Sequence, residues 1–144
     1  MPRGLATLLL LVLLGCQRGG DALPAPAWGS ATCAGCAAVI AGHRHAAQLQ
    51  RADGAVQSFD DPACLFRVLA ADGQTPRAIR FHGPGEDEWI EASAVWFARV
   101  PGQTTPHGDG WAAFPSFAAA QDAVAAAGSG EILPFDQARQ RLGG

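Results

Sequence analysis

The chain has 144 residues, of which 49% are hydrophobic, and this is enough for one compact domain with its own core. Its formal net charge is −3, and all ten of its basic residues are arginines. The chain has no basic tract of the kind that binds nucleic acid, so its composition excludes a nucleic-acid-binding protein. Its length favours a single folding unit.

The N-terminus predicts a secretion signal. An apolar run over residues 5–14 follows Arg3 and is too short to span a bilayer. It ends in Leu-Leu-Gly-Cys at 13–16, which resembles a bacterial lipobox, where Cys16 is acylated on sulfur and becomes the mature N-terminus. An ordinary cleaved signal with a chance cysteine is the alternative. We expect a signal peptide over 1–15, a lipidated cysteine and flexible tether over 16–30, and a domain over 31–144.

The first part of the domain predicts the order strand, strand, helix, strand. Asp53-Gly54 lies between two short alternating runs, which is a strong hairpin signal. Asp61 before Pro62 supplies the side-chain acceptor expected at a helix N-cap. The expected elements are strands over 46–51, 55–59 and 76–81, a helix after Pro62, and a surface turn over 83–88.

The second part repeats this order. Ser116 is the expected cap of an alanine-rich helix that runs through residue 127, and Phe135-Asp136 opens a short last helix as Phe59-Asp60 opens the first. The expected strands are 95–100, 111–114 and 131–135. The sequence therefore predicts an α+β fold in which duplicated small ββαβ units pack as one domain.

Three cysteines remain beyond the lipobox: Cys33, Cys36 and Cys64. In an oxidising compartment an odd number cannot all form intramolecular disulfides, which favours a reduced, metal-binding use of the CxxC pair. A Cys33–Cys36 disulfide with Cys64 as a small buried residue is the alternative. Cys64 is third in its helix, where the helix dipole would lower its pKa, although that position commonly packs inward.

Four fragments carry a family resemblance: CAGC at 33–36, FDDPACL at 59–65, WIEA at 89–92 and TPHG at 105–108. They occur in the order and spacing of the NosL family, the nitrous oxide reductase accessory lipoproteins. The resemblance implies a lipid-anchored periplasmic Cu(I) carrier, with paired ββαβ units similar to the alkylmercury lyase fold. It also implies a copper enzyme, nitrous oxide reductase, as the partner. Gln17 follows the anchor where an aspartate would retain a lipoprotein in the inner membrane, so the periplasmic face of the outer membrane is expected.

The chain departs from the family at its methionine ligands. Where the family motif is CxxCGM, this chain has Ala37 and Ala38 after Cys36, and where the family has TPMG, this chain has TPHG at 105–108. Met1 is the only methionine of the sequence. The adapted site is expected to use Cys36, then Cys33 and His107, with Cys64 as a further candidate ligand. Thiolate and imidazole ligands serve Zn(II) as well as Cu(I), so zinc stays an alternative.

Other functions are weighed against this one. A CxxC thiol-disulfide oxidoreductase would need a strand-CxxC-helix pattern, whereas residues 37–40 lead toward a hairpin. A degenerate paralogue that has lost its metal is a further alternative. Asp60 and Asp61 are interpreted as helix-capping residues, so no catalytic dyad indicates an enzyme. His43 and His45 are interpreted as a solvated strand edge, and His82 as the end of a strand without a function.

Overall fold

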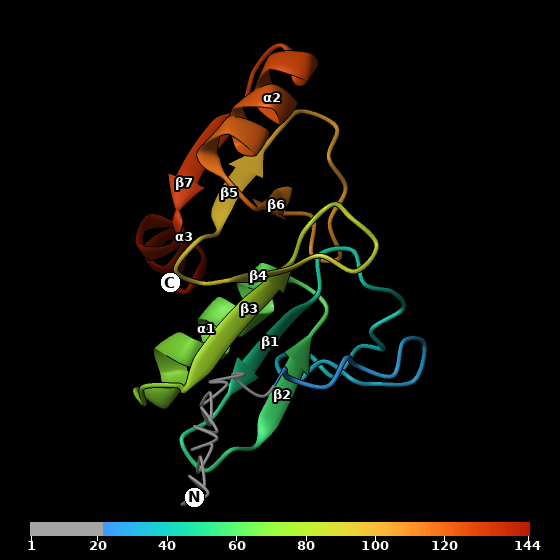
Figure 1. Ribbon diagram of the computed structural model, residues 1–144, viewed down its shortest axis with the longest axis vertical. Coiled ribbons are helices and arrows are strands. Elements are labelled where there is room, and N and C mark those ends of the chain that lie inside the picture. The colour runs from blue at the N-terminus through green and yellow to red at the C-terminus, as the bar shows by residue number, and fades with distance from the viewer. Residues whose placement is uncertain (1–21) are drawn as a thin grey trace, which may run out of the picture.

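The computed structural model describes residues 22–144, in which two antiparallel sheets and three helices form two α+β halves (Figure 1). The strand orders are β2-β1-β3-β4 and β6-β5-β7, so in each half the first strand lies between the second strand and the strand after the helix. This shared order confirms the predicted α+β class and the repeated ββαβ unit. The elements are β1 (Ala47–Gln50), β2 (Val56–Phe59), α1 (Pro62–Asp72), β3 (Ala78–His82), β4 (Trp89–Glu91), β5 (Trp96–Arg99), β6 (Trp111–Phe114), α2 (Phe117–Ala127), β7 (Glu131–Pro134) and α3 (Phe135–Leu142).

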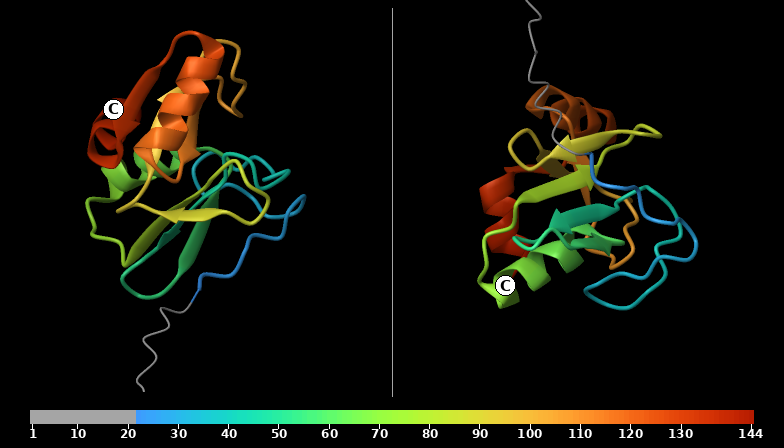
Figure 2. Two further views of the ribbon diagram at one scale, coloured as in Figure 1. Left: turned by 45° about the horizontal axis from the view of Figure 1, so that its top comes forward. Right: turned by 60° about the horizontal axis from the view of Figure 1, so that its bottom comes forward.

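Local sequence signals set where the two longer helices begin. The Asp61 carboxylate accepts a hydrogen bond from the Ala63 backbone N–H at 2.8 Å, and Pro62 occupies the first helical turn of α1. The Ser116 hydroxyl accepts from the Ala119 N–H at 3.1 Å at the start of α2. Both predicted caps are confirmed. Helix α1 packs on the first sheet and α2 on the second (Figure 2).

Four phenylalanines join the two halves in one hydrophobic core. Phe66 of α1 lies 5.5 Å from Phe81 of β3 and 5.6 Å from Phe97 of β5, measured between ring centroids. Phe81 and Phe97 meet edge to face at 4.9 Å, and Phe135 of α3 closes the group at 5.6 Å from Phe66. Because residues of both sheets share this core, the halves form one packed unit.

Two parts of the fold differ from expectation. Strand β4 pairs with β3 and was not predicted, because three residues are too few to show an alternating pattern. The expected surface turn at 83–88 is the loop of this hairpin. Residues 23 and 24 lie in the expected tether, yet buried side chains of the first sheet hold them. Arg80 donates to the Leu23 carbonyl at 2.6 Å, and Gln48 donates to the Pro24 carbonyl at 2.9 Å.

The expected signal peptide over 1–15 and the lipidated Cys16 lie outside the described residues. Over residues 22–144, no helix has both the length and the apolar character needed to cross a membrane.

Candidate metal centre

The CxxC motif forms a short hairpin before β1. Thr32 and Val39 form an antiparallel bridge, the Cys33 N–H donates to the Ala38 carbonyl at 2.8 Å, and the Ala37 N–H donates to the Cys33 carbonyl at 2.9 Å. The positive φ of 62° at Ala37 lets the chain reverse here. The hairpin leaves Cys33 buried at 2% exposure and Cys36 exposed.

Gly35 allows this hairpin to approach helix α1. A Cβ atom at Gly35 would lie 3.0 Å from the Cys64 Cβ, 3.1 Å from the Cys64 carbonyl oxygen and 3.4 Å from the Cys64 Sγ. A side chain at position 35 would therefore force the neighbouring atoms of Cys64 to shift by a few tenths of an ångström. The small size of Gly35 brings Cys33 and Cys36 next to Cys64.

Gly35→Ala should weaken metal binding, because the added methyl group pushes the hairpin away from Cys64. Overpacking of this kind typically costs about 1–3 kcal/mol of stability. Gly42→Ala is the matched control, since a Cβ there meets nothing within 4 Å. Cu(I) titration and thermal unfolding of both variants check the prediction, and identical behaviour of the two would contradict it.

The start of α1 contributes a thiol and a carboxylate. Cys64 is 1% exposed and points into the protein from the first turn of the helix. Asp60 precedes the cap, and its carboxylate accepts from the Cys36 thiol at 3.6 and 3.7 Å. Asp60 was expected only to cap the helix, but Asp61 alone does so. The structure instead directs Asp60 toward the cysteines.

The loop between β5 and β6 supplies an imidazole. The Thr105 hydroxyl donates to Asp109 Oδ1 at 3.0 Å and accepts from the Gly110 N–H at 3.1 Å, which closes the turn that carries His107. The His107 N–H donates to Asp61 Oδ2 at 3.3 Å. The capping carboxylate therefore ties this loop to the start of α1.

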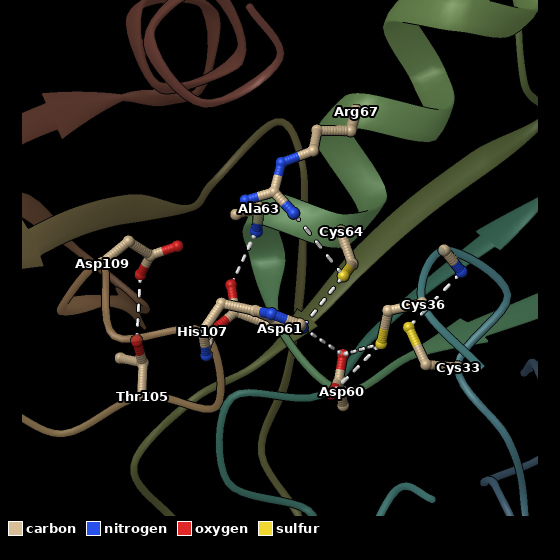
Figure 3. A network of polar contacts seen from close by, with 11 residues as sticks. Cys33, Cys36, Asp60, Asp61, Ala63, Cys64, Arg67, Thr105, His107 and Asp109 are labelled. Atoms are coloured by element: carbon tan, nitrogen blue, oxygen red, sulfur yellow. Dashed lines mark hydrogen bonds and ion pairs between the residues drawn. The ribbon is translucent and has the colours of Figure 1, made fainter. Parts of the chain in front are cut away.

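These three segments converge on one point (Figure 3). The ligand atoms of Cys33, Cys36, Asp60 and Cys64 all lie within 4.8 Å of one another. His107 Nε2 lies 3.1 Å from Cys64 Sγ and 3.3 Å from Asp60 Oδ1. No disulfide joins the three thiols. All four residues of the domain that the sequence singled out as ligand candidates are thus brought together, and Asp60 joins them.

The donor set matches the size and chemistry of a metal site. With a metal–sulfur distance of about 2.3 Å, two ligands of a tetrahedral ion lie about 3.8 Å apart, so a small contraction of the cluster would enclose an ion. Sulfur ligands suit soft ions such as Cu(I) and also Zn(II), while the imidazole and carboxylate suit Zn(II) in particular.

Burial keeps the inner thiols protonated when no metal is present. Burial raises the pKa of Cys33. Burial is also the main cause of the raised pKa of Cys64, and the nearby Cys33 and Cys36 thiols raise it further. This direction agrees with the inward packing of Cys64 at the start of α1. The Arg67 guanidinium lies 4.0 Å from Cys64 Sγ, so it can stabilise the thiolate once a metal displaces the proton.

Asp61 should make the stability of the metal-free protein depend on pH. Burial raises the pKa of Asp61 from 3.8 to about 6, and the nearby charge of Asp109 adds to this. The folded state therefore holds the proton more tightly than the unfolded chain does. Asp61 favours folding below about pH 4, and this contribution, on the order of 3 kcal/mol, is lost as the pH rises through 6.

Asp61→Asn keeps an oxygen acceptor for the cap and removes the titration. Between pH 4 and 6, the unfolding free energy of the wild type should fall relative to that of Asp61→Asn. Urea unfolding at several pH values measures both. Parallel stability curves would contradict the assigned environment of this carboxyl group.

Comparison with known proteins identifies the fold. No family model matches the sequence, and no curated protein matches it. Among solved structures, the copper chaperone NosL from Shewanella denitrificans is similar with a TM-score of 0.66 and 21% sequence identity. The similarity covers 79% of this chain and 94% of that one. The chain has the NosL fold. This confirms the fold that the four sequence fragments indicated.

On the NosL fold, the cluster draws its donors from both halves. Cys33, Cys36, Asp60 and Cys64 come from the first unit, and His107 comes from the second. No sequence pattern marks Asp60 as a ligand, because its orientation depends on the CxxC hairpin that packs beside it. Trp28 packs against His43, His82 and Trp89.

Proposed function

We propose that this protein is a Cu(I) carrier that binds its cargo through Cys33, Cys36 and Cys64, with His107 beside them. The observation that carries the proposal is the convergence of three thiols and an imidazole on the fold of a protein described as a copper chaperone. Thiolates are ligands that favour Cu(I). Since Met1 is the only methionine, residues 22–144 supply no thioether, and the third thiol takes that place.

The exposure of the thiols supports transfer of the ion to a partner. Cys33 and Cys64 are 2% and 1% exposed, whereas Cys36 is exposed at the surface. Cu(I) is stable with two or three ligands, so an incoming ligand of an acceptor can replace Cys36 while the buried thiols still hold the ion. The role proposed is binding and delivery, without catalysis.

The proposed acceptor is a copper enzyme, with nitrous oxide reductase as the first candidate. The order of the NosL-like fragments in the sequence supports this partner. The proposed location is the periplasmic face of the outer membrane, with acylated Cys16 as the anchor. The lipobox-like ending of the apolar run and Gln17 after it support this location.

If Cys16 carries the anchor, Cys16→Ser should release the protein from membranes or mislocalise it. Each buried methylene contributes about 0.8 kcal/mol, and one acyl chain binds only marginally, so stable attachment requires more than one chain. Fractionation of cells that express the wild type or Cys16→Ser measures the distribution. A wild-type protein found wholly in the soluble periplasm would rule out the anchor.

Zinc is the second candidate cargo, and Asp60 is the observation that favours it. A carboxylate within the thiol cluster is a common ligand of Zn(II) and a poor one for Cu(I). The oxidoreductase alternative has less support. Its nucleophile needs a lowered pKa, whereas Cys33 belongs to a β-hairpin and not to the first turn of a helix, and burial raises its pKa.

Competition between the two ions tests the proposal. Reduced protein, titrated with Cu(I) in the presence of a Cu(I) chelator, should bind about one equivalent, and a tenfold excess of Zn(II) should not displace it. Tight Zn(II) binding with weak Cu(I) binding would make this a zinc site on the NosL fold. Binding of neither ion would leave a protein that keeps the fold without the cargo.

A further inference from the structure

A pair of imidazoles lies apart from the thiol cluster and shares no residue with it. The ring centroids of His43 and His82 are 4.7 Å apart, and the ring planes are tilted by 37°. His43 lies half-buried in the turn before β1, and its carbonyl accepts from the Ala46 N–H at 2.9 Å. His82 is 2% exposed at the end of β3. Two segments thus bring two possible metal ligands together.

The hydrogen bonds of His82 leave one ring nitrogen available. His82 Nδ1 lies 2.9 Å from the Gly83 carbonyl oxygen. Because a carbonyl can only accept, Nδ1 carries the hydrogen, and Nε2 of the neutral ring keeps its lone pair. Nε2 makes no hydrogen bond within residues 22–144. A backbone carbonyl that orients the ring in this way is the usual outer-shell partner of a metal-binding histidine.

Two tryptophans enclose the pair. Trp28 meets both rings nearly edge on, at 6.4 Å between centroids, and Trp89 meets His82 at 5.0 Å. Trp28 and Trp89 stack on each other at 6.4 Å. Trp28 is 37% exposed, so this wall borders solvent. It places two fluorescent side chains next to the imidazoles.

We propose that His43 and His82 form a second metal site, for a borderline divalent cation. With a metal–nitrogen distance of about 2.0–2.1 Å, two imidazoles bound to one ion at right angles would have ring centroids about 4.5 Å apart, close to the 4.7 Å between His43 and His82. Right angles between ligands occur in square-planar and octahedral coordination, and Cu(II) and Ni(II) bind nitrogen and oxygen ligands in tetragonal geometries of this kind. Water completes the coordination. The site differs in chemistry from the thiol cluster, which takes a soft ion.

Ni(II) is the probe, because it does not oxidise the thiols as Cu(II) would. The protein is first given one equivalent of Cu(I) and is then titrated with Ni(II), while tryptophan fluorescence is recorded. The wild type should lose fluorescence to a plateau at about one equivalent of Ni(II), because Trp28 and Trp89 adjoin the site. A wild type whose fluorescence does not change would overturn the proposal.

His43→Asn removes one ligand, and His45→Asn is its matched control. His45 is also half-buried, and asparagine tolerates its φ of 67°. His43→Asn should raise the Ni(II) concentration at half-quenching at least about tenfold, since the second imidazole binds intramolecularly. His45→Asn should stay within about twofold of the wild type. Equal effects of the two substitutions, or no effect of His43→Asn, would overturn the proposal.

Cys36→Ser separates this site from the thiol cluster. Without added Cu(I), Cys36→Ser should keep the Ni(II) quenching of fluorescence that depends on His43. His43→Asn should keep the Cu(I) affinity of the wild type. Failure of Cu(I) binding and failure of the imidazole site are therefore recorded in different measurements. Loss of the quenching in Cys36→Ser would place the Ni(II) at the thiols and overturn the second site.

Discussion

Cys36→Ser should lower the Cu(I) affinity by more than about 100-fold. Substitution of a residue that only supports a metal ligand commonly lowers metal affinity about 10- to 100-fold, and Cys36→Ser removes a ligand itself. The side chain is exposed, so the serine variant should fold as the wild type does. Its Sγ belongs to the group of donors that lie within 4.8 Å of one another, and its removal leaves two thiols in that group. Chelator competition measures the affinity, and near-ultraviolet circular dichroism checks the fold.

The companion variants rank the other donors. Cys64→Ser should have an effect as large, because Cys64 lies between the CxxC hairpin and His107. His107→Ala should cost less, since its side chain is 27% exposed and two or three thiolates already satisfy Cu(I). Asp60→Asn should change Cu(I) affinity least and Zn(II) affinity more. Unchanged Cu(I) affinity in Cys36→Ser and Cys64→Ser would remove the basis for the proposed site.

The Cu(I) affinity should fall steeply as the pH is lowered. Burial raises the pKa of both Cys33 and Cys64, so both are protonated in the metal-free protein at neutral pH. Binding must displace these two protons, and each displaced proton changes the apparent affinity about tenfold per pH unit. A decrease of at least about 100-fold per unit below neutral pH is expected, because the Cys36 thiol must also give up any proton it carries when it binds the ion.

Titrations in weakly buffered solution at pH 6, 7 and 8 measure this dependence, both as affinity and as protons released for each Cu(I) bound. The competing chelator needs its own pH correction. Wild type and Cys36→Ser should both show at least the slope that the two buried thiols give, while differing in absolute affinity. An affinity that does not change with pH would mean that the buried thiols do not bind the ion.

The sequence predicted the elements whose signals are local. Asp61 with Pro62, and Ser116 before the alanine-rich run, set where α1 and α2 begin because a cap acts on the N–H groups of its own first turn. Asp53-Gly54 indicated the hairpin between β1 and β2 for a similar reason. Strand β4 was missed, because pairing with β3 rather than its own pattern defines it.

The candidate site was only partly predictable. Spacing identified Cys33 and Cys36, and the position of His107 in the NosL-like fragment identified the imidazole. Their distances depend on how three segments pack, as the contact between Gly35 and Cys64 shows. Asp60 was misread, because adjacent aspartates before a proline look alike in sequence and only the fold distinguishes the cap from the residue that faces the thiols.

X-ray absorption spectroscopy of the protein loaded with one equivalent of copper tests the thiolate carrier most directly. We expect an edge typical of Cu(I) and a copper environment dominated by sulfur, with two or three sulfur ligands and at most one nitrogen. A copper environment of nitrogen and oxygen without sulfur would contradict the thiolate carrier.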